Sequence, residues 1–194
     1  MTLRERILSE ALRQFSRKGY LGTSISEILE SAGASKGGLY NHFKSKEDLF
    51  FAALSEARKI WRERNLAGLE DRARPLEQLI QLLENYRDRY LTETERLPGG
   101  CIFVNLAVEL GDRQPHLAQA VHEGFTRLKT MMKRLLDTEA SQGRLRDGVD
   151  TGQVTELLFS GLLGACVVYA AEPSREKLDG AIAALVGYLE GLRR

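Results

Sequence analysis

Apolar residues recur every three or four positions along most of this chain, and no stretch alternates convincingly between apolar and polar residues at every second position. The first pattern is typical of amphipathic α-helices, whereas alternation is typical of half-buried strands. Only four prolines interrupt the 194 residues. The pattern therefore predicts an all-α fold of about nine helices.

Two capping boxes mark the first two expected helices. Thr2 and Glu5 open a helix over residues 2–18, and Ser24 and Glu27 open a shorter one over residues 25–32. Each helix has one apolar face, which indicates that it packs on a neighbour. In the first helix this face consists of Ile7, Leu8, Ala11, Leu12 and Phe15.

A tight turn follows the second helix. Gly33 fits a left-handed residue that ends the helix, and Ser35 can cap a further short helix from Lys36 to His42. That short helix has few large apolar residues, so we expect Leu39 and Phe43 to anchor it. A packed helix, a tight turn and a short polar helix make a helix-turn-helix, whose second helix enters the DNA major groove.

The rest of the chain predicts a larger helical body. One helix is expected to open at Ser45 and continue through Trp61, before residues 68–75 break the pattern. Further helices are expected over 76–94, 101–110, 115–140 and 150–171, with a last one that ends near Arg194. The helix that opens at Ser45 is long enough to leave one domain and enter the next. We therefore place the domain boundary inside it, with a DNA-binding domain at residues 1–55 and a second domain at 56–194.

Charge is distributed unevenly along the chain. The whole chain has a formal net charge of +1, but residues 1–46 hold eight Lys or Arg against four acidic residues, a net charge of +4. A basic end is what phosphate binding requires. Chance clustering on a solvated helix would produce the same excess, so charge alone does not decide between them.

Several classes of protein are disfavoured by what the sequence contains. Its two cysteines are far apart and make neither a disulfide framework nor a zinc site. The three histidines have no metal-ligand spacing, and no phosphate-binding glycine loop is present. The apolar stretch 157–171 is shorter than the ~20 residues of a spanning helix. We expect a cytoplasmic protein that is not an enzyme, with no metal, cofactor or membrane partner. An all-helical enzyme and a helical interaction module that does not bind DNA remain the alternatives.

The first quarter of the chain resembles a known family. The residues that carry the resemblance are Ile7–Phe15, Gly19-Tyr20, Thr23–Ile28, Gly33–Gly37, Leu39-Tyr40, His42-Phe43 and Lys46–Leu49. They closely resemble the N-terminal domain of the TetR/AcrR transcriptional regulators. One departure is Gly38, where that family often has a small hydroxyl residue.

This resemblance implies a ligand-responsive regulator, most simply a repressor that binds a palindromic operator as a homodimer. Asn41 can recognise adenine, and Lys36 can pair with guanine or a phosphate. Tyr40 could instead pack on the apolar anchors, and His42 and Lys46 could be ordinary surface residues. The candidate DNA-binding residues are Ser24, Ser35, Lys36, Gly37, Tyr40, Asn41, His42 and Lys46.

The last two expected helices are apolar on more than one side. Such helices form either the core of a single chain or a four-helix interface between two subunits. The resemblance favours the dimer. Its candidate interface residues are Leu157, Leu158, Gly161, Leu162, Ala165, Tyr169, Leu185, Tyr188 and Leu192.

The larger domain is expected to bind a small apolar or aromatic effector that releases the protein from DNA. Cys101 opens a helix, where the helix dipole stabilises a thiolate, so it is either a modification site or a buried apolar residue. The aromatic and Met candidates could instead be ordinary core residues that contact no effector. The candidate effector-binding residues are Trp61, Tyr86, Cys101, Phe103, Phe125, Met131 and Tyr169.

Overall fold

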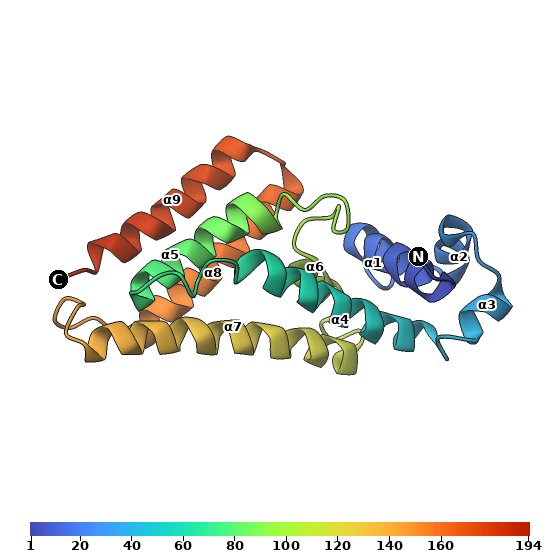
Figure 1. Ribbon diagram of the computed structural model, residues 1–194, viewed down its shortest axis with the longest axis horizontal. Helices are drawn as coiled ribbons and strands as arrows, with labels where there is room; N and C mark the ends of the chain where they lie inside the picture. The colour runs from blue at the N-terminus through green and yellow to red at the C-terminus, as the bar shows by residue number, and fades with distance from the viewer. The chain divides into compact units, whose positions relative to one another are not determined.

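The computed structural model describes all residues from 1 to 194 and confirms the all-α fold, with nine α-helices, one π-helical segment and no strand (Figure 1). The elements are α1 (Leu3–Lys18), α2 (Ile25–Ala32), α3 (Lys36–Tyr40), α4 (Lys46–Asn65), α5 (Pro75–Asn85), η1 (Tyr86–Tyr90), α6 (Ile102–Leu110), α7 (Pro115–Ser141), α8 (Thr151–Ala171) and α9 (Arg175–Gly191).

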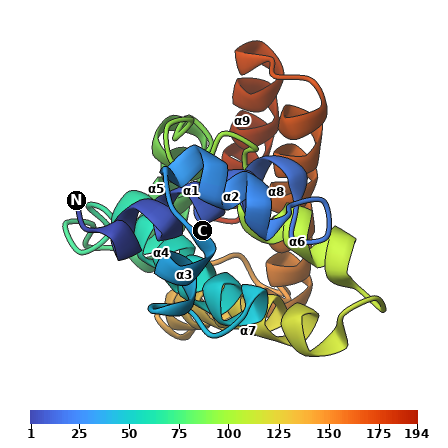
Figure 2. The ribbon, with the colours of Figure 1, turned by 90° about the vertical axis from the view of Figure 1, so that its right-hand side faces the viewer.

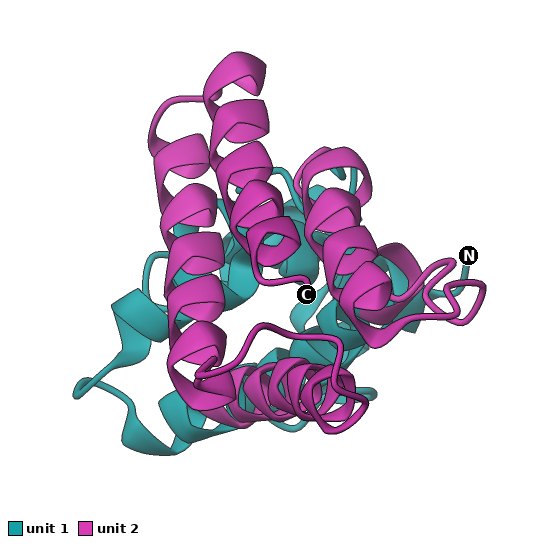
Figure 3. Cartoon of the chain, turned by 90° about the vertical axis from the view of Figure 1, so that its left-hand side faces the viewer, with its two compact units in different colours: residues 1–61, 93–121 teal, residues 62–92, 122–194 magenta.

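The chain forms two compact units (Figure 3). Unit 1 comprises Met1–Trp61 and Glu93–Val121, and unit 2 comprises Arg62–Thr92 and His122–Arg194. Helices α4 and α7 each begin in unit 1 and end in unit 2. The division into domains 1–55 and 56–194 stays a prediction, because contact compactness does not show which segments fold independently.

Three expected helix ends are corrected by the structure. The recognition helix α3 ends at Tyr40 rather than His42, and α9 ends at Gly191. Where one α-helix was expected over 76–94, the α-helix α5 ends at Asn85 and the π-helix η1 follows it directly to Tyr90. In this segment the Leu91 amide donates to the Tyr86 carbonyl at 3.0 Å. The buried residues Leu82, Tyr86 and Tyr90 keep a spacing of four residues into and through this turn, so periodicity alone does not reveal it.

Unit 1 is built around α1. Ile7, Ala11 and Phe15 of the predicted stripe are at most 1% exposed, whereas Leu8 is only half-buried. Phe15 forms an aromatic cluster with Tyr20 and Phe50, with ring centroids 5.1 to 6.1 Å apart. This cluster packs α1 against the first turns of α4, and α1 also contacts α2, α3 and α6 (Figure 2).

In unit 2, α8 packs along α9, and α5 packs on α9 (Figure 1). The α8–α9 contact is close at Gly161, where an added Cβ would lie 2.7 Å from Leu185 Cδ2. By length and composition α8 is the one helix that could span a membrane, and 33% of its apolar window is buried. Interface helices of soluble proteins have the same composition, so this feature does not by itself indicate a membrane.

Candidate nucleic-acid interface

The first helix of the predicted motif starts as the capping box requires. The Glu27 amide donates to Ser24 Oγ at 3.2 Å, and the Ser24 amide donates to Glu27 Oε2 at 2.8 Å. These bonds satisfy backbone donors that the first turn of a helix leaves without partners. The start of α2 is therefore fixed by the residues that predicted it.

The turn between α2 and α3 is set by Gly33. Its φ of 59° and ψ of 45° are left-handed, which a glycine adopts without strain. The Ala34 amide then donates to the Leu29 carbonyl at 2.9 Å and closes the end of α2. The turn predicted from the sequence is confirmed.

Helix α3 is held to unit 1 by two apolar side chains. Ser35 Oγ accepts from the Gly38 amide at 3.1 Å and opens the helix. Leu39 is fully buried and Phe43 is 2% exposed, as predicted for the anchors. Gly38 is half-buried, and an added Cβ would meet Leu3 Cδ2 at 3.0 Å. The missing side chain at residue 38 thus lets the start of α1 approach the recognition helix.

The opposite side of α3 is polar and exposed. Tyr40 is 57% exposed, which argues against the alternative in which it packs on the anchors. Asn41 and His42 are exposed in the turn after the helix. The predicted DNA-binding residues that lie together on this surface are Ser35, Lys36, Gly37, Tyr40, Asn41 and His42.

Lys46 occupies a different environment from the rest of the predicted set. Its Nζ donates to the Tyr20 carbonyl at 2.5 Å and lies 4.3 Å from the centre of the Tyr20 ring. Burial lowers the pKa of the Lys46 ammonium, and the nearby carboxylates of Glu109 and Glu27 oppose that shift. A role for Lys46 on a phosphate stays a prediction, since this conformation directs its ammonium toward the protein.

A further cation beside α3 was not among the candidates. The Arg4 guanidinium lies over the Phe43 ring at 5.2 Å from the centroid, and the side chain is exposed. This contact places a positive charge next to the end of α3 without burying it. From the sequence, Arg4 is an exposed residue of the first helix that could lie near the DNA backbone, with a solvated helix face as the alternative.

The environment of Glu27 should make the stability of the fold depend on pH. Its hydrogen bond with Lys18, followed by its bonds with Ser24, lowers the pKa of the carboxyl from 4.5 to about 2. A lowered pKa stabilises the fold above the unfolded value and loses that contribution as the pH falls from 4.5 toward 2. We expect Glu27→Gln to lower the thermal unfolding temperature at pH 6, and the difference from the wild type to shrink below pH 4.5. Glu30→Gln, at an exposed position on the same helix, is the control. A difference in unfolding temperature between Glu27→Gln and the wild type that stays constant with pH would contradict the prediction.

Models of protein families match both parts of the chain. Residues 7–53 match "Bacterial regulatory proteins, tetR family", and residues 75–185 match "Tetracyclin repressor-like, C-terminal domain". The second match alone spans more than half of the chain. This chain belongs to the TetR family of transcriptional regulators. The family assignment made from the first quarter of the sequence is therefore confirmed, and with it the DNA-binding role in transcription regulation.

Relatives of this TetR-family chain match it over most of its length. The transcriptional regulator LmrA of Bacillus subtilis is 31% identical over 164 residues, which cover 82% of this chain and 84% of LmrA. The transcriptional repressor NemR of Escherichia coli K12 is 27% identical over 190 residues, or 93% and 90% of the two chains. A crystal structure of a TetR transcriptional regulator from Chloroflexus aurantiacus superimposes with a TM-score of 0.89 at 31% identity, covering 99% of this chain and 96% of that one.

The residues predicted for a TetR-family dimer interface lie in two environments. Leu157 and Tyr188 are 48% and 40% exposed, so both side chains are open to a second subunit. Val167 and Val168 of α8, which were not among the candidate interface residues, are 49% and 51% exposed. Gly161, Tyr169, Leu185 and Leu192 are half-buried. The structure places Leu158, Leu162 and Ala165 in the core of the chain itself, at most 6% exposed.

The predicted effector residues are spread over both units. Trp61, Cys101 and Phe103 belong to unit 1, and Tyr86, Phe125, Met131 and Tyr169 belong to unit 2. Cys101, Phe103 and Tyr86 are at most 7% exposed, and the other four are half-buried. Their convergence on one ligand stays a prediction.

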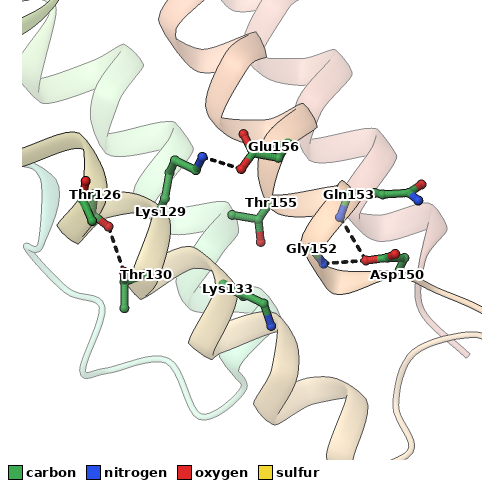
Figure 4. Close-up of a pocket in the computed structure, with 9 residues that line it drawn as sticks. All are labelled: Thr126, Lys129, Thr130, Lys133, Asp150, Gly152, Gln153, Thr155 and Glu156. Carbon is green, nitrogen blue, oxygen red and sulfur yellow. Dashed lines mark hydrogen bonds and ion pairs between the residues drawn. The ribbon is translucent and has the colours of Figure 1, made fainter. Parts of the chain in front are cut away.

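Two hollows lie within unit 2. An apolar cavity of about 260 Å³ between α8 and α9 is lined by Tyr169 together with Gly164, Val168 and Leu178. An open hollow of about 720 Å³, lined almost entirely by polar and charged residues, lies between α7 and the start of α8 (Figure 4). Lys129 forms an ion pair with Glu156 at its edge, and none of the predicted effector residues lines it.

Proposed function

We propose that this TetR-family chain is a homodimeric repressor that binds a palindromic operator through α3 and leaves it when a small-molecule effector binds. The observation that carries the proposal is the two-sided character of α3. Leu39 and Phe43 fasten one side to the core, while Lys36, Tyr40 and Asn41 remain exposed on the other. A short helix with this arrangement is suited to a groove rather than to a core.

The exposed side chains have the chemistry of base and phosphate recognition. The Asn41 amide can bond to adenine through a donor and an acceptor, and Lys36 can donate to guanine or to a phosphate. Tyr40 and His42 can contact phosphates, which position a protein on the duplex without specifying sequence. The absence of a side chain at Gly37 lets the backbone approach the duplex.

A homodimer explains how so short a helix becomes selective. Two recognition helices related by a two-fold axis bind half-sites about 34–36 Å apart, and such a site is palindromic. The exposed apolar residues of α8 and α9, among them Leu157, Val168 and Tyr188, supply the surface for the second subunit.

Effector release requires a ligand that prefers one conformation of the chain. Helix α4 runs without a break from Lys46 to Asn65 and is shared by both units, so a change in its direction would alter the placement of α3. Allosteric coupling of the usual size, about 1–3 kcal/mol, would weaken operator binding roughly 5–150-fold. Modification of Cys101, which is 3% exposed directly before α6, is the alternative trigger, and a Cys101→Ser variant that still releases DNA with every thiol reagent would remove it.

The experiment is selection of bound duplexes from a random DNA pool, followed by affinity measurements on the selected site. We expect a palindrome, and binding that weakens steeply with salt because phosphate contacts release counterions. Asn41→Ala should weaken binding to that site by about 10–100-fold, the value of one bidentate base contact. Lys59→Ala on α4, which also removes an exposed side chain, is the control and should change affinity little.

Two results would contradict the proposal. One is equal affinity for the selected palindrome and a scrambled duplex, with no dependence on salt. The other is full operator affinity in Asn41→Ala and Lys36→Ala, since the exposed side of α3 would then take no part in binding. A ligand screen for release of the selected duplex then identifies the effector.

A further inference from the structure

A carboxylate from α6 holds the turn that leads into the helix-turn-helix. The Tyr20 amide donates to Glu109 Oε2 at 2.7 Å, and the Leu21 amide donates to Glu109 Oε1 at 2.8 Å. Both oxygens of one carboxylate are therefore bonded to consecutive backbone amides. Hydrogen bonds to an ionised acceptor are shorter and stronger than neutral ones, and two together fix direction as well as distance.

The residue before this pair is adapted to the same carboxylate. Gly19 has a φ of 75°, which favours glycine, and an added Cβ would lie 2.3 Å from Glu109 Oε1. Any other residue at position 19 would displace the carboxylate as well as strain the backbone. The carboxylate of Glu109 therefore needs a glycine at position 19, although 90 positions separate the two residues in the chain.

The same turn is braced from its other side. The Tyr20 carbonyl accepts from Lys46 Nζ at the start of α4, and Thr23 Oγ1 donates to the Gly19 carbonyl at 2.7 Å. Ser24, the N-cap of α2, follows directly. The position of this turn consequently sets where α2 begins, and α2 carries the recognition helix through the Gly33 turn.

A second contact joins α1 to the segment before α6. The Gly99 amide donates to Ser16 Oγ at 3.0 Å, and Asn105 Nδ2 donates to the Gly99 carbonyl at 2.9 Å. An added Cβ at Gly99 would lie 1.8 Å from the Ser16 carbonyl oxygen, so the two backbones are in direct contact. Asn105 and Glu109 are four residues apart and share one face of α6. Helix α6 thus holds the end of α1 and the following turn at two points.

We propose that Glu109 is a positioning residue for operator binding: its carboxylate sets the α1–α2 turn, and through it the direction in which α3 meets the groove. The inference rests on the function proposed above. Glu109 makes no contact with DNA in this role. Any movement of α6 acts on the turn through this carboxylate, in addition to the path through α4.

Removing the Glu109 carboxylate should affect non-specific and operator-specific DNA binding differently. Loss of one negative charge near the basic end of the chain leaves non-specific attraction to phosphates unchanged or stronger. Loss of the fixed turn weakens only the binding that needs an exact half-site fit. A residue that merely stabilises the fold would instead weaken both kinds of binding together.

The test uses two variants in the full-length protein. Glu109→Gln keeps the shape but presents an NH₂ group to one of the two amides, and Glu109→Asp keeps the charge but is one methylene too short to reach both. Val108→Ala is the control, because Val108 is the adjacent residue and is 80% exposed. Affinity is measured for the selected operator and for a scrambled duplex of equal length, together with the thermal unfolding temperature.

We expect the ratio of the two affinities to fall roughly tenfold or more in both variants, in line with the loss of a charge-assisted hydrogen bond. Affinity for the scrambled duplex should stay level in Glu109→Asp and stay level or rise in Glu109→Gln. An unchanged ratio in folded variants overturns the inference. A parallel loss of both affinities with a lower unfolding temperature, or failure of both variants to fold, also overturns it by showing a structural role alone.

Gly19→Ala gives an independent check, since the added Cβ should displace the carboxylate and lower the same ratio. Adding Glu109→Gln to Gly19→Ala should then cost little more. If the wild type shows no preference for any selected duplex, the proposed function fails before Glu109 is tested. If the wild type shows the preference and the Glu109 variants keep it, only this inference fails.

Discussion

A Val168→Glu variant is expected to behave as a folded monomer and to lose more than about 100-fold of its affinity for the operator. Val168 is 51% exposed on α8 and lies eleven residues after Leu157, which is 48% exposed. Residues at this spacing share one helical face, and exposed Gly164 lies on it between them. A carboxylate on such a face would be buried without a partner when two subunits meet, which costs several kcal/mol.

The loss of DNA affinity follows from the loss of the second recognition helix. A monomer binds one half-site, whereas a dimer binds the second half-site at a high effective concentration, which typically contributes 10²–10⁴-fold. Sedimentation velocity measures the mass of the particle, and circular dichroism shows whether the chain remains helical. Operator affinity is then measured on the same samples.

Ala170→Glu is the matched control for this variant. It adds the same carboxylate two residues away on an exposed position of α8, on a different side of the helix from Leu157 and Gly164. This control should remain dimeric. If Val168→Glu sediments as a dimer at micromolar concentration and binds operator like the control, then α8 does not form the subunit contact in the way proposed.

Local signals in the sequence were sufficient for the helix-turn-helix. A capping box acts within four residues, a left-handed glycine acts at one position, and buried anchors repeat at helical spacing, so all three are visible in a short window. Ser24, Gly33 and Leu39 accordingly have the roles that the pattern predicts. The end of α3 at Tyr40 was not predictable in this way, because a helix of five residues has little more than one turn of pattern.

Contacts between distant residues left no such signal. Glu109 bonds the Tyr20 amide across 89 positions, and Lys46 reaches the Tyr20 carbonyl across 26. A glutamate near the end of an expected helix has the same appearance in sequence whether it is solvated or bonded to a turn. The sequence likewise marked α8 as apolar but could not separate Leu158, which faces the core, from Leu157, which is exposed.

An Arg74→Ala substitution is expected to destabilise the protein by about 3 kcal/mol, the lower end of the cost of breaking a buried ion pair, because Glu139 is fully buried but the Arg74 side chain is 33% exposed. Arg74 Nη2 donates to Glu139 Oε1 at 2.6 Å, and the Glu139 side chain is fully buried. The second carboxylate oxygen has no hydrogen-bond partner, and the nearest cation, Arg144 Nη1, is 3.9 Å from it. Without Arg74 the buried carboxylate would keep only that distant charge.

Removing both charges should cost much less than removing one. An Arg74→Met, Glu139→Leu double variant replaces the pair with apolar side chains, and such replacements are often close to neutral. Urea unfolding at a fixed protein concentration gives the free energy for each single variant and for the double one, because dimerisation makes stability depend on concentration. The coupling energy from this cycle should be well above the ~0.5 kcal/mol found for independent sites.

The ion pair of Lys177 with Glu172 supplies the control for burial. Its Nζ–Oε2 distance is also 2.6 Å, but both side chains are more than half exposed. Exposed ion pairs contribute about 0–1 kcal/mol, so Lys177→Ala should change the free energy of unfolding little. Equal losses of unfolding free energy in Arg74→Ala and Lys177→Ala would contradict the prediction. They would show that the burial of Glu139 does not raise the cost of removing its partner, because solvent or a shift of the start of α5 compensates the carboxylate.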